Sequence, residues 1–514
     1  MRPAALEGRK MMIGLLIQDQ VFEQDIRELL MSFYPGESYA HRVQEEVEFY
    51  VETELKDGQI GVFIWEKPEN TSGAASVSDS DRLRQAPDGL EGWTLTAGRR
   101  EPSDLSDRAG SKNVIKKMFY QMLTERTGKE QPWGSLTGIR PTKIALSRLE
   151  EGWSEEEIRS FMKGTYLASD EKIDLSIEIA ARERELLKPL DYARGYSLYV
   201  GIPFCPTTCL YCSFTSYPIS KWKGRTGEYL QALFRELEYT ADQMKGRPLD
   251  TIYIGGGTPT SLSAEDLDCL LTRLEELFDT KHALEFTVEA GRPDSITEEK
   301  LQVLKHHNIS RISINPQTMN QKTLDLIGRH HTVEQVKDTF RMARRLGFDN
   351  INMDLIMGLP GETIEDVEHT LQEIEALKPD SLTVHALAVK RAARLNLFRE
   401  EYGAFRATDT ARMIELSEAS ARRLGMEPYY LYRQKNMAGN FENVGYSQPG
   451  KACIYNILIM EELQTIAACG AGTTTKVVYH EENRRERCEN VKEAALYIEK
   501  IEEMIDRKRA LLEE

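Results

Sequence analysis

The chain has 514 residues, of which 40% are hydrophobic and 29% are charged, and its formal net charge is -17. This length and composition exclude a small disulfide-stapled domain, and the negative charge argues against nucleic acid as a partner. The apolar run 11–17 is too short to span a bilayer and precedes no small-residue cleavage site, so we expect a cytoplasmic protein without a membrane span.

Residues 1–67 predict a small α+β domain. A strand is expected near residues 12–18 and a helix near 22–33, and the Asp57-Gly58 step between two alternating runs is typical of a β-hairpin. Residues 68–112 are rich in Ser, Gly, Asp and Arg, which favours a flexible insertion or linker. Helical spacing then returns over 113–190, which we interpret as a helical connector.

The segment 191–400 alternates strand-like runs with stretches of helical length. Such a β-then-α rhythm predicts parallel strands in a barrel or an open α/β sheet. After residue 400 the pattern changes to helices with a few strands, which suggests a separate accessory domain of mixed α/β structure over 401–514. The strand-like runs lie at 197–202, 251–257, 284–290, 311–316, 350–360 and 381–387, with further strand candidates at 429–434, 454–460 and 465–473.

Three cysteines stand close together directly after the first of these strands. Cys205, Cys209 and Cys212 have Cys-x3-Cys-x2-Cys spacing, which lets one loop present three thiolates to a metal centre. A structural zinc site is the alternative, but it requires a fourth ligand, and no Cys or His pair stands nearby. The remaining cysteines are scattered singly. The spacing therefore indicates an iron–sulfur cluster with one iron open to another ligand.

Polar residues and glycines follow the later strands at their carboxyl ends, where barrel enzymes build their sites. The run Gly255-Gly256-Gly257-Thr258-Pro259 permits close approach of a ligand to the backbone. Glu289, Gln317 and Asp354 come at the ends of, or within, the next strands, and Arg329 adds a cation suited to a carboxylate. Each residue alone is equally explained as a loop or buried polar group, but the regular placement favours a common site.

At the cysteines, with Tyr211 before the last one, the sequence resembles the radical S-adenosylmethionine (SAM) superfamily. More narrowly, residues 199–389, and more loosely the chain as far as residue 476, resemble the oxygen-independent coproporphyrinogen III oxidases and their relatives. The matching runs are YVGIPFCPTTCLYC, GGGTPT, RISINPQT, Gly328-Arg329, DLIMGLP and, in the looser part, CGAG. The whole chain is most similar to the longer, Firmicute-type coproporphyrinogen dehydrogenases. The resemblance implies a partial (β/α)6 barrel, a [4Fe-4S] cluster and SAM. By position it implies cofactor contacts at Tyr199, Tyr211, Gly256, Gly257, Thr258, Glu289, Gln317, Arg329, Asp354 and Ala386.

The same resemblance implies a reaction of haem biosynthesis. Two propionates of coproporphyrinogen III would each lose hydrogen and carbon dioxide and become vinyl groups of protoporphyrinogen IX. This tetrapyrrole chemistry needs an external electron donor, flavodoxin- or ferredoxin-like, and an acceptor. Two positions depart from the oxidase pattern, since Phe214 replaces a further cysteine and Gly201 a histidine. An aromatic residue at the first is frequent in the haem-chaperone branch, so a haem carrier without oxidase activity remains an alternative. An RNA-modifying radical SAM enzyme is a third interpretation.

Basic residues near the end of the barrel are candidates for anchoring substrate carboxylates. The first set is Lys390, Arg391, Arg394 and Arg399, although a charge run after a strand is more often solvated surface. Arg433 and Lys435, beside several tyrosines, form a second candidate surface, for which packing is an equally good explanation. His330, His331 and His385 are left without an assigned role because no spacing singles one out.

Overall fold

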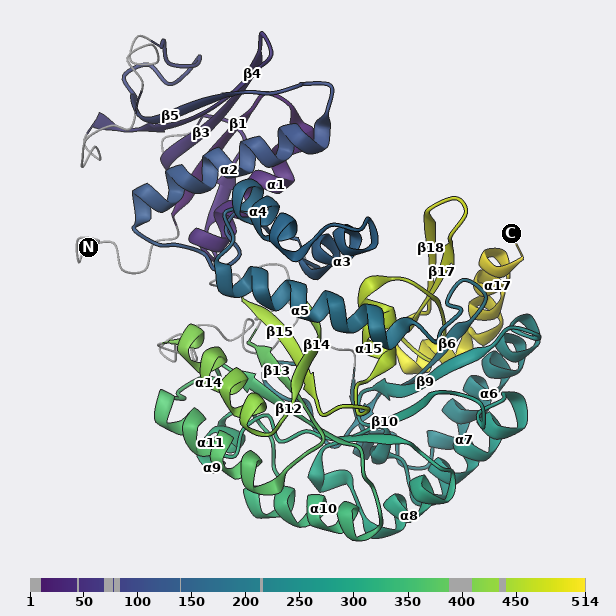
Figure 1. Cartoon of the computed structure of the whole chain (residues 1–514). Coiled ribbons are helices and arrows are strands. Elements are labelled where there is room, and N and C mark those ends of the chain that lie inside the picture. The colour runs from purple at the N-terminus through teal and green to yellow at the C-terminus, as the bar shows by residue number, and fades with distance from the viewer. Residues whose placement is uncertain are drawn as a thin grey trace. The chain divides into compact units, whose positions relative to one another are not determined.

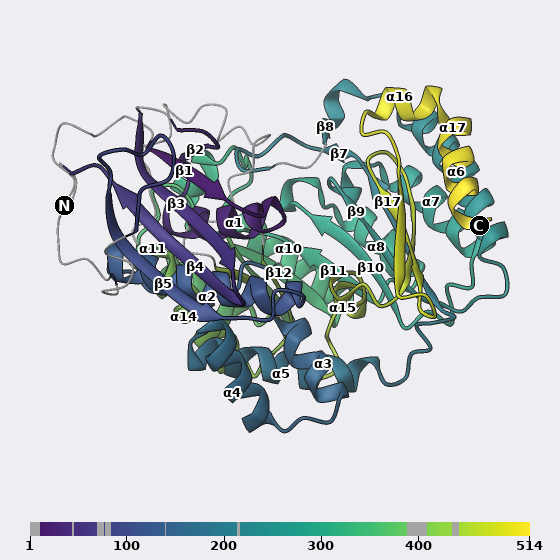
Figure 2. The ribbon, with the colours of Figure 1, turned by 90° about the horizontal axis from the view of Figure 1, so that it is seen from above.

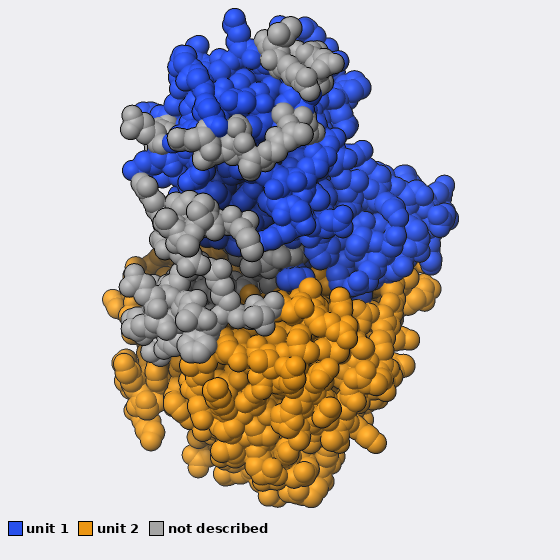
Figure 3. Space-filling model, turned by 90° about the vertical axis from the view of Figure 1, so that its left-hand side faces the viewer, with its two compact units in different colours: residues 1–177, 433–441 blue, residues 178–432, 442–514 orange. Residues whose placement is uncertain are grey.

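The computed structural model describes residues 11–43, 46–68, 77, 84–138, 140–212, 216–387, 409–433 and 441–513. The chain divides into two compact units, which Figure 3 colours separately. Unit 1 comprises residues 1–177 and 433–441, and unit 2 comprises residues 178–432 and 442–514. The division falls inside helix α5 (Asp170–Leu187), so the segment expected as one helical connector is shared between the two units.

Unit 1 contains a five-stranded mixed sheet in the order β2-β1-β3-β4-β5, whose strands are seen in Figure 2. The first strand pairs in parallel with β2 and β3, and the β3/β4 and β4/β5 pairs are antiparallel. One hydrophobic core joins the sheet to helices α1 and α2. The elements are β1 (Met12–Ile17), α1 (Glu23–Phe33), β2 (Ser38–Ala40), β3 (Val47–Lys56), β4 (Gln59–Glu66), β5 (Thr94–Pro102), α2 (Arg108–Thr127), α3 (Thr142–Glu150) and α4 (Glu155–Tyr166).

The local signals at the start of unit 1 are confirmed. Strand β1 and helix α1 lie where apolar periodicity predicts them, and β3 and β4 form the expected hairpin with Lys56 opposite Gln59. Asp57 and Gly58 have φ angles of 52° and 70°. Two successive left-handed residues are what a two-residue hairpin turn requires, and Asp-Gly supplies them at low energetic cost.

The expectation of a flexible linker over 68–112 is wrong for its second half, which contains β5 and the start of α2. This strand has few apolar residues, so composition alone does not reveal it. It is held by backbone pairing with β4 and by ion pairs, in which Arg99 contacts Glu125 and Arg100 lies 2.6 Å from Glu54. Such partners come from distant parts of the sequence, and a local pattern cannot show them.

Unit 2 is built on six parallel strands in the order β6-β9-β10-β11-β12-β13, which confirms the partial (β/α)6 barrel. Helices follow these strands in sequence and lie on the outer, convex side of the sheet in Figure 1. The strands are β6 (Tyr196–Ile202), β9 (Leu249–Gly256), β10 (Glu285–Gly291), β11 (Arg311–Ile314), β12 (Ile351–Met357) and β13 (Ser381–Ala386). The helices are α6 (Thr226–Gln243), α7 (Ala264–Leu277), α8 (Glu298–His306), α9 (Gln321–Leu326), α10 (Val333–Arg345) and α11 (Ile364–Leu377).

The described part of residues 401–514 does not form a separate accessory domain. Most of it belongs to unit 2, where its strands extend the barrel sheet on both sides, with β14 and β15 beyond β13 and β16 to β18 beyond β6. Helices α16 and α17 lie against α6 (Figure 2). These elements are α14 (Thr410–Arg423), β14 (Glu427–Arg433), β15 (Glu442–Ser447), α15 (Ile454–Glu461), β16 (Thr465–Cys469), β17 (Thr474–Tyr479), β18 (Arg484–Glu489), α16 (Ala494–Glu499) and α17 (Ile501–Leu512).

One expected strand is a helix. The run 454–460 forms α15, because a short, continuously apolar segment carries no periodicity that separates a buried helix from a buried strand. No helix in the described ranges is both long and apolar enough to cross a membrane.

Candidate functional site

The three clustered cysteines lie at the end of the first barrel strand. Cys205 belongs to the short strand β7 (Phe204–Cys205), which pairs with β8 (Tyr217–Pro218), and Cys209 and Cys212 lie in the loop that follows. Backbone bonds tie this loop to the segment after α9, since Leu210 N donates to Ile327 O at 2.9 Å. All three thiols are free of disulfides. The barrel thus holds this loop in place.

Donors from two other strand ends approach the cysteine sulfurs. Thr258 Oγ1 donates to Cys205 Sγ at 3.5 Å, and Arg292 Nη1 donates to Cys209 Sγ at 3.9 Å. Burial raises the pKa of the Cys205 thiol, and the Thr258 hydroxyl opposes that shift. Donors of this kind stabilise a thiolate, which is the form that binds metal.

The glycine run at the end of β9 brings its backbone against the ends of β6 and β7. Gly257 N donates to Ile202 O at 2.7 Å, and Thr258 N donates to Phe204 O at 2.6 Å. A Cβ at Gly257 would lie 2.5 Å from the carbonyl oxygen of Phe204, so a larger residue does not fit this turn. The absence of a side chain is therefore required by packing within the protein.

Two carboxylates face the barrel interior with neighbours from adjacent strands. Tyr253 OH donates to Glu289 Oε1 at 2.5 Å, and burial raises the pKa of Glu289 to about 7. Asp354 Oδ1 accepts from Asn352 Nδ2 at 2.7 Å, and its Oδ2 lies 3.9 Å from His385 Nε2. Burial alone would raise the pKa of Asp354, but the His385 imidazole and the Asn352 amide bring it below its usual value. The barrel therefore raises the pKa of one buried carboxyl group and lowers that of the other.

Gln317 combines backbone strain with an unsatisfied side chain. Its φ is 69°, in the left-handed region, and its backbone N–H donates to Asp354 O at 2.9 Å. The side chain is only 7% exposed, yet Oε1 accepts no hydrogen bond from the residues that the structure describes. Strained residues and buried polar atoms without partners gather at ligand sites, because the ligand supplies the missing contact.

Tyrosine rings form a layer in the interior of the barrel. Tyr253 and Tyr455 stack with their centroids 4.5 Å apart, and Tyr199 stacks on both at 6.1 Å. Tyr199 and Tyr253 are paired in the β6/β9 register, and Tyr455 comes from α15. The same hydrophobic cluster includes Tyr429 and other residues of the C-terminal part of unit 2. This segment therefore lines the barrel as well as extending its sheet.

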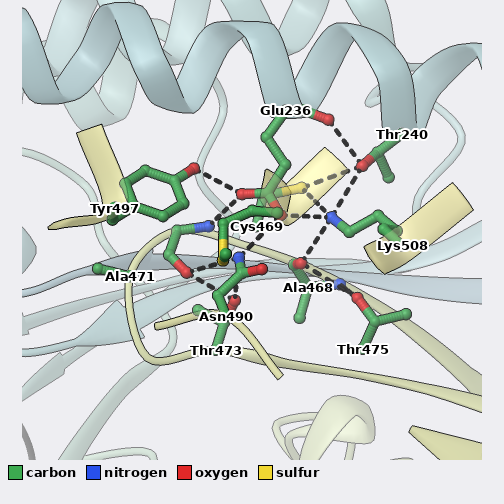
Figure 4. A network of polar contacts seen from close by, with 12 residues as sticks. Glu236, Thr240, Ala468, Cys469, Ala471, Thr473, Thr475, Asn490, Tyr497 and Lys508 are labelled. Carbon is green, nitrogen blue, oxygen red and sulfur yellow. Dashed lines mark hydrogen bonds and ion pairs between the residues drawn. The ribbon is translucent and has the colours of Figure 1, made fainter. Parts of the chain in front are cut away.

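A buried polar network holds β16, the strand next to β6, and the turn that follows β16 (Figure 4). Glu236 of α6 and Lys508 of α17 form an ion pair of 2.7 Å, with side chains 0% and 1% exposed. Glu236 Oε2 accepts from Gly470 N at 2.8 Å and from Tyr497 OH at 2.5 Å, and Lys508 Nζ donates to Ala468 O at 2.9 Å. A buried carboxylate with this many donors has its charge compensated, so the network is a fixed part of the fold.

The network reaches β6, the strand that leads into the cysteine loop. Tyr229 OH donates to Gly201 O at 2.7 Å and accepts from Ala471 N at 3.0 Å. Gly201 belongs to β6 and lies four residues before Cys205. Because β6 pairs with β16 on one side and with β9 on the other, the turn after β16 supports the start of the cysteine loop from the side opposite the glycine run.

Comparisons with known proteins agree with this geometry. The family model described as "Radical SAM superfamily" matches residues 199–374. The "Oxygen-independent coproporphyrinogen-III oxidase-like protein HemZ" of Bacillus subtilis (strain 168) is 45% identical over 407 residues, which are 78% of this chain and 81% of that protein. The chain belongs to the radical SAM coproporphyrinogen oxidase family.

Other members of this family match shorter stretches. "Heme chaperone HemW" of Bacillus subtilis is 40% identical over 38% of this chain and about half (51%) of its own length. The "Oxygen-independent coproporphyrinogen III oxidase" of Escherichia coli (strain K12) is 33% identical over 37% of this chain and 41% of its own. A solved structure of coproporphyrinogen III oxidase (HemN) from Escherichia coli matches with a TM-score of 0.50 and 23% identity, covering 63% of this chain and 73% of that one. This last likeness shows the fold.

Membership of the radical SAM family implies a [4Fe-4S] cluster and SAM as cofactors. The residues present fit both groups. The three cysteine thiols lie on one loop and form no disulfide, donors approach the sulfurs of Cys205 and Cys209, and Gln317 Oε1 offers a buried acceptor that needs a donor. In the described ranges no three His, Cys, Asp or Glu side chains converge as ligands of one metal ion.

The structure brings most of the expected site residues together at the strand ends. Ala386 closes β13, where its amide donates to Asn443 Oδ1 at 3.0 Å. Arg329 is buried and donates to Asn315 O. Burial would lower the pKa of Arg329, but Tyr211 and Cys209 hold it above its usual value, so Arg329, Tyr211 and the cysteine loop are neighbours.

Some expectations are changed or lie outside the described residues. Arg433 is 3% exposed, and its guanidinium donates to Leu136 O at 2.8 Å within unit 1, so it belongs to a packed interior rather than to an open substrate surface. Exposed His330 and buried His331 also lack a role in this site. Phe214, Lys390, Arg391, Arg394, Arg399 and Lys435 lie outside the described residues.

Sequence reasoning missed several residues of the site. Tyr253, Arg292 and Tyr455 were not singled out, and His385 was named without a role. Arg292 follows directly on the run FTVEAG, so its place after a strand end was available as a signal. Tyr455 had no such signal, because α15 reaches the barrel only through tertiary packing.

Proposed function

We propose that this chain carries out the oxygen-independent oxidative decarboxylation of two coproporphyrinogen III propionates to the vinyl groups of protoporphyrinogen IX. The observation that carries the proposal is the 45% identity with an oxidase-like relative over 78% of the chain. Three cysteines on the loop after β6, and buried carboxyl groups on β10 and β12 of the same barrel, are compatible with it. An external electron donor, flavodoxin- or ferredoxin-like, and an electron acceptor belong to the proposal because the substrate gives up electrons.

In this proposal the chain's own residues divide the work of binding. When bound, the cluster and SAM supply the oxidant that removes hydrogen from the substrate. The glycine run with Thr258, together with Glu289, Gln317, Arg329 and Asp354, would hold the polar parts of SAM, with Tyr199, Tyr211 and Ala386 beside them. Stacked tyrosines exclude water from the interior, which protects a reactive species from side reactions.

One anaerobic assay tests the proposal. The protein is reconstituted with iron and sulfide, reduced, and incubated with SAM and coproporphyrinogen III, after which 5′-deoxyadenosine and porphyrin products are separated by chromatography. We expect 5′-deoxyadenosine together with a vinyl product. The Cys209→Ala variant is the control and should yield neither. Production of 5′-deoxyadenosine without any vinyl product would remove coproporphyrinogen III as the substrate while retaining the cofactor chemistry.

A haem carrier is the second candidate, because the "Heme chaperone HemW" of Bacillus subtilis is 40% identical over 38% of this chain. Anaerobic titration with haemin separates the two functions. A carrier binds about one haem per chain and forms no vinyl product in the assay above. Substrate turnover without stoichiometric haem binding would exclude the carrier.

A further inference from the structure

Arg292 occupies a position between the barrel and the cysteine loop. It follows β10, three residues after Glu289, and is 2% exposed. Its Nη1 donates to Thr207 Oγ1 at 2.6 Å, to Thr207 O at 3.1 Å and to Cys209 Sγ at 3.9 Å. One guanidinium edge therefore fixes the loop between the first two cysteines and approaches a ligand sulfur.

The other edge of the same guanidinium is occupied by a carboxylate. Arg292 Nε donates to Asp294 Oδ1 at 2.9 Å, and Nη2 donates to Asp294 Oδ2 at 2.6 Å, which is a bidentate pair. All three nitrogens thus have partners within the protein. Arg292 is consequently not an anchor for a substrate carboxylate, and its charge acts on the groups around it.

The position of this charge relative to the sulfur has an electrostatic consequence. One-electron reduction of a [4Fe-4S] cluster adds negative charge to its iron and sulfur atoms, and nearby charges and hydrogen bonds set the reduction potential. The Arg292 side chain is 3% exposed, whereas that of Asp294 is 20% exposed, so water screens the carboxylate more than the cation. The cation also lies on the sulfur side of the pair, since it is the group that donates to Cys209.

We propose that Arg292 sets the reduction potential of the cluster: it donates to the Cys209 sulfur, anchors the loop through Thr207, and makes the cluster easier to reduce, while Asp294 limits the effect. The reaction concerned is the uptake of one electron by the oxidised cluster from an external one-electron donor. The inference depends on the cluster alone, and its outcome is independent of the identity of the organic substrate.

Potentiometric titration with dithionite, monitored by the electron paramagnetic resonance signal of the reduced cluster, tests the proposal on the reconstituted full chain without SAM or tetrapyrrole. Arg292→Gln keeps a donor but removes the charge, so its midpoint potential should be more negative than that of wild type. Arg292→Lys should lie closer to wild type. Asp294→Asn removes the opposing charge and should shift the potential in the positive direction.

Opposite shifts distinguish an electrostatic role from a structural one, because a general loosening of the loop would move both variants the same way. Equal potentials in Arg292→Gln and wild type, or shifts of the same sign in Arg292→Gln and Asp294→Asn, would overturn the proposal. If Arg292→Gln fails to bind iron, the shift of the midpoint potential in Asp294→Asn decides: a positive shift supports the proposal, and a negative or absent shift overturns it.

Lys508→Met is the matched control for loss of a buried, paired cation. Lys508 contacts Glu236, Thr240, Ala468 and Cys469, none of which belongs to the cysteine loop. This variant should be less stable than wild type but keep its midpoint potential. A shift as large as that of Arg292→Gln would also contradict the proposal.

Discussion

At the scale of single residues, Glu289 gives the protein a distinct pH dependence. Burial raises its pKa in the folded protein to about 7, above the value of 4.5 for a free glutamate. Between these two pH values the side chain of Glu289 is deprotonated in the unfolded chain but still protonated in the folded one. The contribution of this group to the free energy of unfolding therefore falls as the pH rises. Glu289→Gln cannot ionise, and relative to wild type it should gain up to about 3 kcal/mol of unfolding free energy above pH 7.

Denaturant unfolding of the cofactor-free protein at pH 5 and pH 8 measures this difference. The free energies of unfolding of the variant and of wild type should be close at pH 5 and differ at pH 8. Glu299→Gln, an exposed substitution on α8, is the control for the loss of a carboxylate at the surface. A constant difference between Glu289→Gln and wild type across this range would show that Glu289 does not titrate there.

The residue scale also shows how far sequence reasoning reaches into the site. Cys205 was predicted from the cysteine spacing, and Glu289 and Asp354 were predicted because they stand at the end of, or within, strands that the apolar pattern marks. Tyr253, which donates to Glu289, and Arg292, which donates to Cys209, were not predicted. Hydrogen bonds such as Tyr253 to Glu289 join residues on different strands, and their distances depend on strand register, which a local pattern does not contain.

At the scale of elements, the turn after β16 is expected to determine the position of β6, which leads into the cysteine loop. Gly470 has a φ of 111°, and a Cβ there would lie 2.4 Å from the backbone oxygen of Gly201. Gly470→Ala therefore requires the β6 backbone to move, and we expect a loss of roughly 3 kcal/mol or more in unfolding free energy. Iron content after reconstitution should fall as well, since β6 leads into the cysteine loop.

Gly472→Ala is the matched control in the same turn. Its φ is 73°, but the nearest atom to a Cβ there is 3.7 Å away, which is ordinary contact. The expected loss is about 1 kcal/mol, from backbone strain alone, with unchanged iron binding. Thermal or denaturant unfolding of both variants provides the comparison. Equal losses would mean that the close approach of Gly470 to Gly201 does not hold in solution.

Elements were predicted well where their own sequence carries the period. All six barrel strands were located, because buried parallel strands are short apolar runs separated by amphipathic helices. Strand β5 and helix α15 were not recognised: the first is too polar, and the second is apolar on every side. The parallel pairing of β16 with β6 joins residues more than 260 positions apart, so it had no local signature.

At the scale of the whole molecule, the division into two units was anticipated only in outline. Sequence composition placed a boundary near residues 68–112, whereas the units divide inside α5, and residues 433–441 return to unit 1 from late in the chain. Composition detects polar, aperiodic segments, but a helix that continues from one core into the next has no break in its pattern. Such a boundary is visible only in the tertiary contacts.

Each unit has its own hydrophobic core, and we therefore expect two separable unfolding transitions. The cysteines and the proposed SAM contacts all lie in unit 2. SAM added to the reconstituted protein should therefore raise the free energy of unfolding of one transition only, by about 2.7 kcal/mol at 100 times its Kd.

Phe119, fully buried between α2 and the sheet of unit 1, offers the reciprocal test. Phe119→Ala should lower the other transition by about 3–5 kcal/mol. Anaerobic scanning calorimetry resolves both effects, and a single transition shifted by SAM and by Phe119→Ala alike would show that the two cores unfold as one.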